Sequence, residues 1–178
     1  MNIQARSQVA ETKLIGAKWS ALYFATIGAF AGFLGSVAIL GAEIAGARVM
    51  GFAPFMLMRY YATLHDGPGA LLMSSRSFIL DAFSMHLAFG SALGAVFVLL
   101  ASWQRIEKFR IYVAAGVGFG LCVWIFNFYF LLIWLQPLIN GKAFIVENIP
   151  WWVAAMTHAA YGVTVALVSY PFRNDVRN

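Results

Sequence analysis

Two histidines lie in the most apolar parts of this chain, each with a glycine four residues later. His86 occurs in MHLAFGSALGAV before Gly90, and His158 occurs in MTHAAYGVTVAL before Gly162. Four residues are about one helical turn, so we expect each ring and its glycine to share one helix face. Imidazole binds metal ions, ligates haem iron and transfers protons, and the repeated arrangement therefore indicates a candidate binding site.

Three kinds of chemistry fit this histidine pair. The rings can form interhelical hydrogen bonds, with each other or with Asn127 or Thr157, that hold a helix bundle together. They can serve as the axial ligands of a haem b, with the following glycines making room for the macrocycle. They can also join Glu43 or Asp81 in a site for a proton or a divalent metal ion such as zinc or copper. The sequence leaves these alternatives open.

The composition indicates that these histidines lie in a membrane. The chain has 178 residues, of which 62% are hydrophobic and 11% are charged, and its mean hydropathy is +0.77. A water-soluble domain of this length needs more surface charge. The net charge of +5 comes from basic residues beside apolar runs, which is typical of membrane topology and not of nucleic-acid binding. A single cysteine, Cys122, excludes an internal disulfide and a cysteine-based metal cluster.

Four charge-free runs each exceed the roughly 20 residues that a helix needs to cross the hydrocarbon core. We predict an all-α integral membrane protein with one domain over residues 1–178 and helices at about 19–46, 80–103, 111–136 and 150–171. The first run is too long for the apolar part of a secretory signal, so we expect it to be retained. Between the first two helices, the apolar segment VMGFAPFMLM is too short to span and predicts an interfacial helix or a re-entrant segment.

The lysines and arginines predict the orientation of these helices. The positive-inside rule places the more basic end, which includes both termini, in the cytoplasm. Eight of the twelve basic residues belong to that end, namely Arg6, Lys13, Lys18, Arg105, Lys108, Arg110, Arg173 and Arg177, and the other four are Arg48, Arg59, Arg76 and Lys142.

In this orientation the polar groups of the helices fall in one layer. At about 1.5 Å per residue, His86 and His158 lie roughly 9 and 12 Å from the outer ends of their helices, and Asn127 lies roughly 14 Å from the same side. Glu43 and Asp81 lie nearer the outer surface. Ionisable groups inside a membrane are costly and are usually functional, so we expect the site in the outer half of the bilayer.

Small and aromatic residues predict how the helices pack. Glycines four residues apart let two helix backbones approach closely. The third helix instead carries aromatic residues on every side between Trp124 and Trp134, so part of this belt must face lipid or another subunit. We expect close helix packing at Gly28, Gly32, Gly90, Gly94, Gly116, Gly120 and Gly162.

The order of these motifs resembles the YagU-like family, a group of uncharacterised bacterial inner-membrane proteins. The resemblance covers most of the chain, and it is carried by GAFAG (Gly28–Gly32), GAE (Gly41–Glu43), ENIPW (Glu147–Trp151) and the two intramembrane histidines. The chain lacks the prolines that follow GAE in the family pattern, and Asn127 stands where that pattern has a histidine. This difference disfavours a three-histidine metal site. The resemblance implies a four-helix fold in the bacterial inner membrane, without an established chemistry.

No nucleophile or acid–base motif of an enzyme occurs in the sequence. We therefore expect a small protein that is not an enzyme by itself. Its predicted role is that of a structural or accessory subunit, which packs against a larger membrane complex through the aromatic face of the third helix. The alternative is a membrane protein that binds haem b or a metal ion with His86 and His158.

Overall fold

The computed structural model describes the backbone of residues 3–73 and 75–173, and the side chains of residues 20–73 and 80–173. Every regular element in this part of the chain is helical, and four helices are long and apolar enough to cross a membrane. These spans are Ser20–Val49, Leu80–Trp103, Phe109–Asn140 and Trp151–Phe172. The prediction of an all-α protein with four spans is therefore confirmed.

The first two spans belong to single α-helices, whereas the third is composite. It consists of α4 (Phe109–Ile125), a π-helical segment η2 (Phe126–Leu132) and α5 (Ile133–Asn140). The span runs past its predicted end at 136, because the left-handed Gly141, and not Pro137, ends it. The helices of the other spans are α1 (Ile3–Val49), α3 (Ser75–Trp103) and α7 (Trp151–Ser169), which is followed by the short η3 (Tyr170–Phe172).

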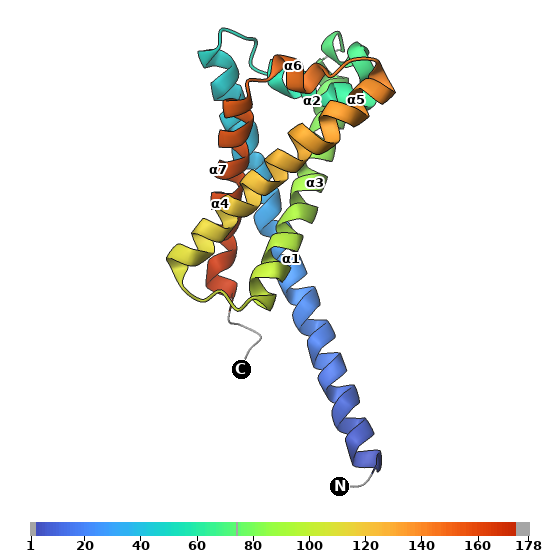
Figure 1. Cartoon of the computed structure of the whole chain (residues 1–178), viewed down its shortest axis with the longest axis vertical. Coiled ribbons are helices and arrows are strands. Elements are labelled where there is room, and N and C mark those ends of the chain that lie inside the picture. The colour runs from blue at the N-terminus through green and yellow to red at the C-terminus, as the bar shows by residue number, and fades with distance from the viewer. Residues whose placement is uncertain (1–2, 74, 174–178) are drawn as a thin grey trace.

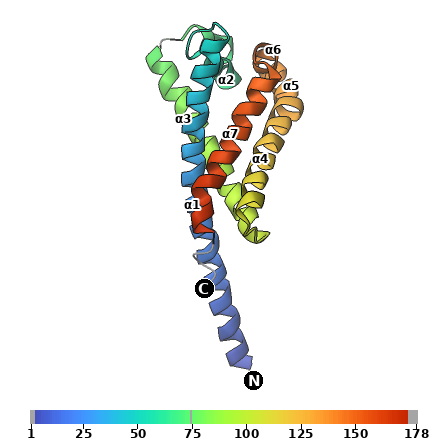
Figure 2. The ribbon, with the colours of Figure 1, turned by 90° about the vertical axis from the view of Figure 1, so that its left-hand side faces the viewer.

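The spans pack in the order α3, α1, α7 and α4. α1 packs along α3 and along α7, and α7 packs along α4. Figure 1 shows α4 and its continuation running obliquely across the front of the other helices, and Figure 2 shows α4 beside α7 from another side. α3 and α4 meet toward their connecting loop, where the Phe97 ring packs against the rings of Tyr112 and Phe119. Beyond Phe97 the two helices diverge.

Glycines lie where the tightly packed helices cross. A methyl group on Gly94 would collide with the backbone of Gly28 and Gly32, and one on Gly162 would collide with the backbone of Gly116. Such collisions show that the paired backbones are in contact. The crossing glycines are Gly28, Gly32, Gly90 and Gly94 between α1 and α3, and Gly116, Gly120 and Gly162 between α4 and α7. The glycine one turn after each histidine therefore lies at a helix crossing.

A group of short helices covers one end of the bundle. It comprises α2 (Met56–Asp66), η1 (Gly67–Leu71) and α6 (Phe144–Asn148), which lie together beside α5 (Figure 1). Gln136 is fully buried there, and its Nε2 donates to Thr63 Oγ1 at 2.8 Å. Its Oε1 accepts from the Ile145 backbone N–H at 2.9 Å. These bonds join α5, α2 and α6 into a cap over the spans. The segment VMGFAPFMLM, expected to be an interfacial helix or re-entrant, is helical only at Val49, where α1 ends, and from Met56, where α2 begins.

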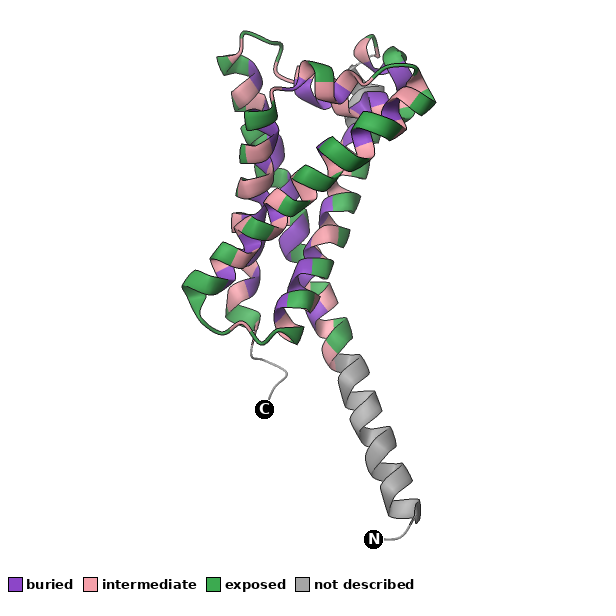
Figure 3. Cartoon of the chain, in the orientation of Figure 1, coloured by how far each residue is buried: buried purple, intermediate pink, exposed green. Residues whose placement is uncertain are grey.

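The spans bury their inner faces and expose apolar outer faces. Figure 3 shows buried residues where helices face one another and exposed residues on the outward sides. The exposed side chains include large hydrophobic residues such as Leu22, Phe30 and Trp134. An apolar surface of this extent suits a hydrocarbon environment.

Candidate ligand-binding cavity

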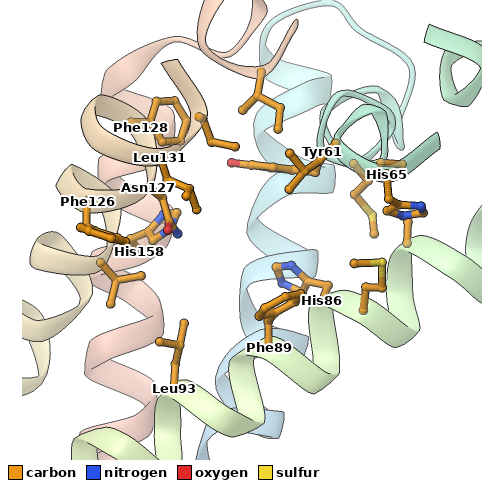
Figure 4. A pocket seen from close by; sticks show the side chains of 18 of the residues that line it. Tyr61, His65, His86, Phe89, Leu93, Phe126, Asn127, Phe128, Leu131 and His158 are labelled. Atoms are coloured by element: carbon orange, nitrogen blue, oxygen red, sulfur yellow. The ribbon is translucent and has the colours of Figure 1, made fainter. Parts of the chain in front are cut away.

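A cavity of about 580 Å³ opens where α3 diverges from η2. Its volume is within the range that is typical of small-molecule sites. α2 bounds it at the capped end, and Leu93 lies at the opposite end (Figure 4). Its walls are mostly apolar and include Met58, Met85, Leu93, Phe89, Phe119, Phe126, Phe128 and Leu131.

Both intramembrane histidines line this cavity, from different helices. Figure 4 shows His86 of α3 and His158 of α7 on opposite sides of it, with Asn127 of η2 next to His158. Asn127 lies in the π-helical segment, and π-helical turns inside α-helices are frequent at functional sites. The structure thus brings together three members of the predicted polar layer.

The two imidazoles differ in their hydrogen bonds. His158 Nδ1–H donates to the Ala154 carbonyl at 2.8 Å, which leaves Nε2 with a free lone pair when the ring is neutral. A backbone carbonyl on the far nitrogen is a common way to orient a histidine toward a ligand. His86 Nε2 is buried and has no hydrogen-bond partner among the described atoms. His158 therefore has Nε2 available for a bound molecule, whereas Nε2 of His86 is occluded and only the rest of that ring lines the cavity.

Tyr61 of α2 adds another polar group near the capped end of the cavity (Figure 4). Burial, and next the nearby Glu43 carboxyl, raise the pKa of Tyr61 well above its usual range. Its hydroxyl consequently stays protonated at any physiological pH. Sequence reasoning missed this residue, although the amphipathic pattern of Met56–Asp66 was a usable signal.

Glu43 and Asp81 do not belong to the lining of the cavity. Glu43 is buried on α1 near Tyr61, and its Oε2 lacks a hydrogen-bond partner in the described part of the chain. Asp81 is exposed on α3. No three His, Cys, Asp or Glu side chains among the described residues are grouped so that they could hold a metal ion. Of the predicted metal ligands, only His86 and His158 share the cavity.

Two further residues of the lining have no counterpart in the sequence-based site. Cys122, the only cysteine of the chain, is an exposed residue of α4 that contributes to the cavity wall. His65 of α2 also contributes, but it is exposed and its Nδ1 lies 2.9 Å from Asp66 Oδ1. His65 therefore has its Nδ1 engaged with Asp66, and it lies at the exposed rim of the cavity and not between the spans.

No protein-family model, curated protein or solved structure matches this chain. The resemblance to the YagU-like family stays a prediction from short motifs. The chemistry of the cavity has to be inferred from its own residues.

Proposed function

We propose that this chain is a multi-pass protein of the bacterial inner membrane that binds a membrane-soluble small molecule between α3 and η2. The observation that carries the proposal is the meeting of His86 and His158 in one apolar cavity of about 580 Å³ inside the spans. A buried polar atom without a partner costs about 1–3 kcal/mol. A molecule that gives the imidazoles lining this cavity a hydrogen-bond partner avoids such a cost.

The position of the cavity favours entry from the bilayer. Phe89 and Phe126 line it from α3 and η2, and they are 63% and 59% exposed on the outside of the protein. The mouth of the cavity is therefore flanked by side chains that face the hydrocarbon region. We assign no catalytic step to the chain itself, since the cavity supplies imidazoles, an amide, a phenol and the Cys122 thiol, and no described hydrogen bond joins that thiol to an imidazole.

We further propose that both termini lie in the cytoplasm. Arg105, Lys108 and Arg110 join α3 to α4 at the end opposite the cap. At the capped end, Arg59 Nη1 donates to two backbone carbonyls, and Lys142 lies 3.1 Å from Glu147. Counting Arg173 at the first end and Arg48 at the capped end, the described basic residues number four and three, and this bias supports the positive-inside assignment. The side chains of Arg6, Lys13, Lys18, Arg76 and Arg177, on which the sequence argument also depends, lie outside the described residues.

A cavity-filling variant tests the binding proposal. The wild-type protein, purified in mild detergent, should release one organic molecule per chain on solvent extraction, as identified by mass spectrometry. Leu93→Trp fills the cavity and should release none, whereas Leu100→Trp, at a position of α3 that is 41% exposed and outside the cavity lining, should behave as the wild type. Equal amounts from both variants would refute the proposal. A visible spectrum and a metal analysis of the same sample show whether the molecule is haem b or a metal ion.

The exposed stripe on the third span supports a second candidate, an accessory subunit. Phe126, Phe130 and Trp134 follow one another at four-residue spacing and are 59%, 68% and 71% exposed. Large aromatic residues are enriched in protein interfaces. Photo-crosslinking from position 130 in native membranes should then give a discrete protein adduct. Crosslinks to lipid alone would contradict this role.

A further inference from the structure

We infer that the cavity takes a neutral aromatic diol, a hydroquinone-type head with a hydrocarbon tail, whose two hydroxyl groups bond to His86 and His158. This inference rests on the proposed function, since it identifies the class of molecule that the cavity binds. Three features of the cavity carry it: the absence of charge in its lining, the placement of its hydrogen-bonding atoms, and its aromatic walls.

The first feature excludes anionic ligands. No Lys, Arg, Asp or Glu is among the described residues that line the cavity. Buried charges need an opposite charge or several hydrogen bonds to be stable. A phospholipid headgroup, or a haem with two propionates, would have no basic side chain to pair with here. The cavity is therefore suited to a neutral molecule.

The second feature, the placement of the hydrogen-bonding atoms, favours a ligand with a hydroxyl group at each of two ends. His158 Nε2 is an acceptor, because Nδ1 donates to Ala154. The His86 ring lines the opposite side of the cavity (Figure 4), with its Nε2 occluded. A hydroxyl both donates and accepts, so it suits either tautomer of His86. A ring with a hydroxyl group at each end can face both imidazoles at once, and the Asn127 amide lies beside His158 (Figure 4).

The third feature concerns the body of the ligand. The rings of Phe89, Phe119 and Phe128 contribute to the walls, and aromatic rings pack favourably against another ring. A tail can leave between Phe89 and Phe126 into the bilayer, because both side chains also face outward. The cavity thus combines an aromatic head site with an exit to lipid.

Cys122 supplies the assay, because it is the only cysteine and lies on the cavity wall. The full-length protein in lipid nanodiscs is labelled with an uncharged maleimide, with and without decyl-benzohydroquinone. Ascorbate under argon keeps the diol reduced, so that no quinone reacts with the thiol. The matched control ligand is its dimethyl ether, which has the same ring and tail but cannot donate a hydrogen bond.

The diol should protect Cys122 at a concentration about 10-fold lower than the ether, which corresponds to about one hydrogen bond. His86→Phe and His158→Phe should each reduce this preference. His65→Phe should retain it, because His65 already pairs with Asp66 at the rim. The comparison of the two ligands on the wild-type protein needs no variant, so a histidine variant that fails to fold leaves the inference testable.

The outcomes separate the two proposals. Equal protection by the diol and the ether overturns the hydroquinone inference and leaves the apolar binding cavity in place. No protection by either ligand, in a protein that elutes as a single folded species, contradicts the binding proposal as well. A haem absorption band in the purified protein that is lost in His86→Phe and His158→Phe overturns the inference in favour of haem.

Discussion

The helix α3 has one face that touches the neighbouring backbone through glycines and another that lines the cavity with large side chains. Toward α1 it presents Gly90 and Gly94, and the two backbones touch. Toward η2 it presents Phe89 and Leu93, which precede Gly90 and Gly94 by one residue each. Here the cavity lies between α3 and η2. α7 does not divide in this way, because the backbones of both His158 and Gly162 pack against α4 and the His158 ring reaches the cavity from that same face.

The difference shows how a small bundle keeps a cavity open. Backbone contact at the glycines fixes α3 on α1 and α4 on α7 without side chains between them. On the cavity side, the buried Phe97 ring packs between α3 and α4 near their connecting loop. At the other end of the cavity, Gln136 joins the helices of the cap. The cavity is therefore bounded by rigid contacts at both ends. Changes at the glycines, the cap and the histidines should affect the protein in that order of size.

The largest effect is expected from Gly94→Ala. Its methyl group would meet the Gly28 and Gly32 backbones, which cannot move aside as a flexible side chain can. We expect a loss of about 3 kcal/mol in the free energy of unfolding. Gly41→Ala on α1 is the matched control, since nothing lies near its added methyl group, and it should be neutral or stabilising. Denaturation in detergent measures both; equal stability of the two variants would show that the glycine crossing is not tight.

A smaller loss in the free energy of unfolding is expected from Gln136→Ala at the cap. The change removes the bonds to Thr63 and to the Ile145 N–H and leaves that buried N–H without a partner. We expect a cost of about 2 kcal/mol. Hydrogen exchange should quicken in α6, whereas Asn148→Ala, which loses a single bond to the Phe144 carbonyl, should change it less. Unchanged exchange in Gln136→Ala would mean that the cap is held by apolar contacts alone.

A gain in stability is expected from His86→Leu in the ligand-free protein. Its Nε2 is buried without a partner, and removing it relieves a cost of roughly 1 kcal/mol. The same variant should lose ligand. His65→Leu, whose ring is exposed and paired with Asp66, should change neither quantity by much. A destabilised His86→Leu would indicate that this histidine is a structural residue and not a ligand-binding one.

The smallest effect concerns pH and Tyr61. In the unfolded chain this phenol loses its proton near pH 10, whereas its raised pKa keeps it protonated in the folded protein. The unfolded state then binds fewer protons, so stability should fall as pH rises above about 10. The melting temperature of Tyr61→Phe should fall less over the same alkaline range. Identical curves for the two proteins would contradict the burial of this hydroxyl.

The sequence was sufficient to predict the four membrane spans but not to predict the cavity between them. Long apolar runs set the four helices, and glycines four residues apart marked the faces that cross. The pairing of His86 with His158 was expected from depth alone, whereas Glu43 and Asp81 were placed in the same layer and lie off the cavity. Depth follows from counting residues, but the direction of a side chain depends on helix rotation and packing order.

The π-helical segment, and the packing of the expected short helix with α5 and α6 as a cap, were not predicted, for a related reason. An extra residue in the turn around Asn127 has no composition signal of its own. Gln136 looks like an ordinary residue near a helix end, yet it is fully buried because α2 and α6 fold over it. Such contacts are long-range, and local patterns do not encode them.

The central claim is that His86 and His158 hold a small molecule in the cavity. Native mass spectrometry of the protein released from nanodiscs measures this most directly. The account predicts one bound organic molecule per chain in the wild type and in His65→Leu, and none in the double variant with leucine at positions 86 and 158. The same bound molecule at the same occupancy in all three proteins would contradict it.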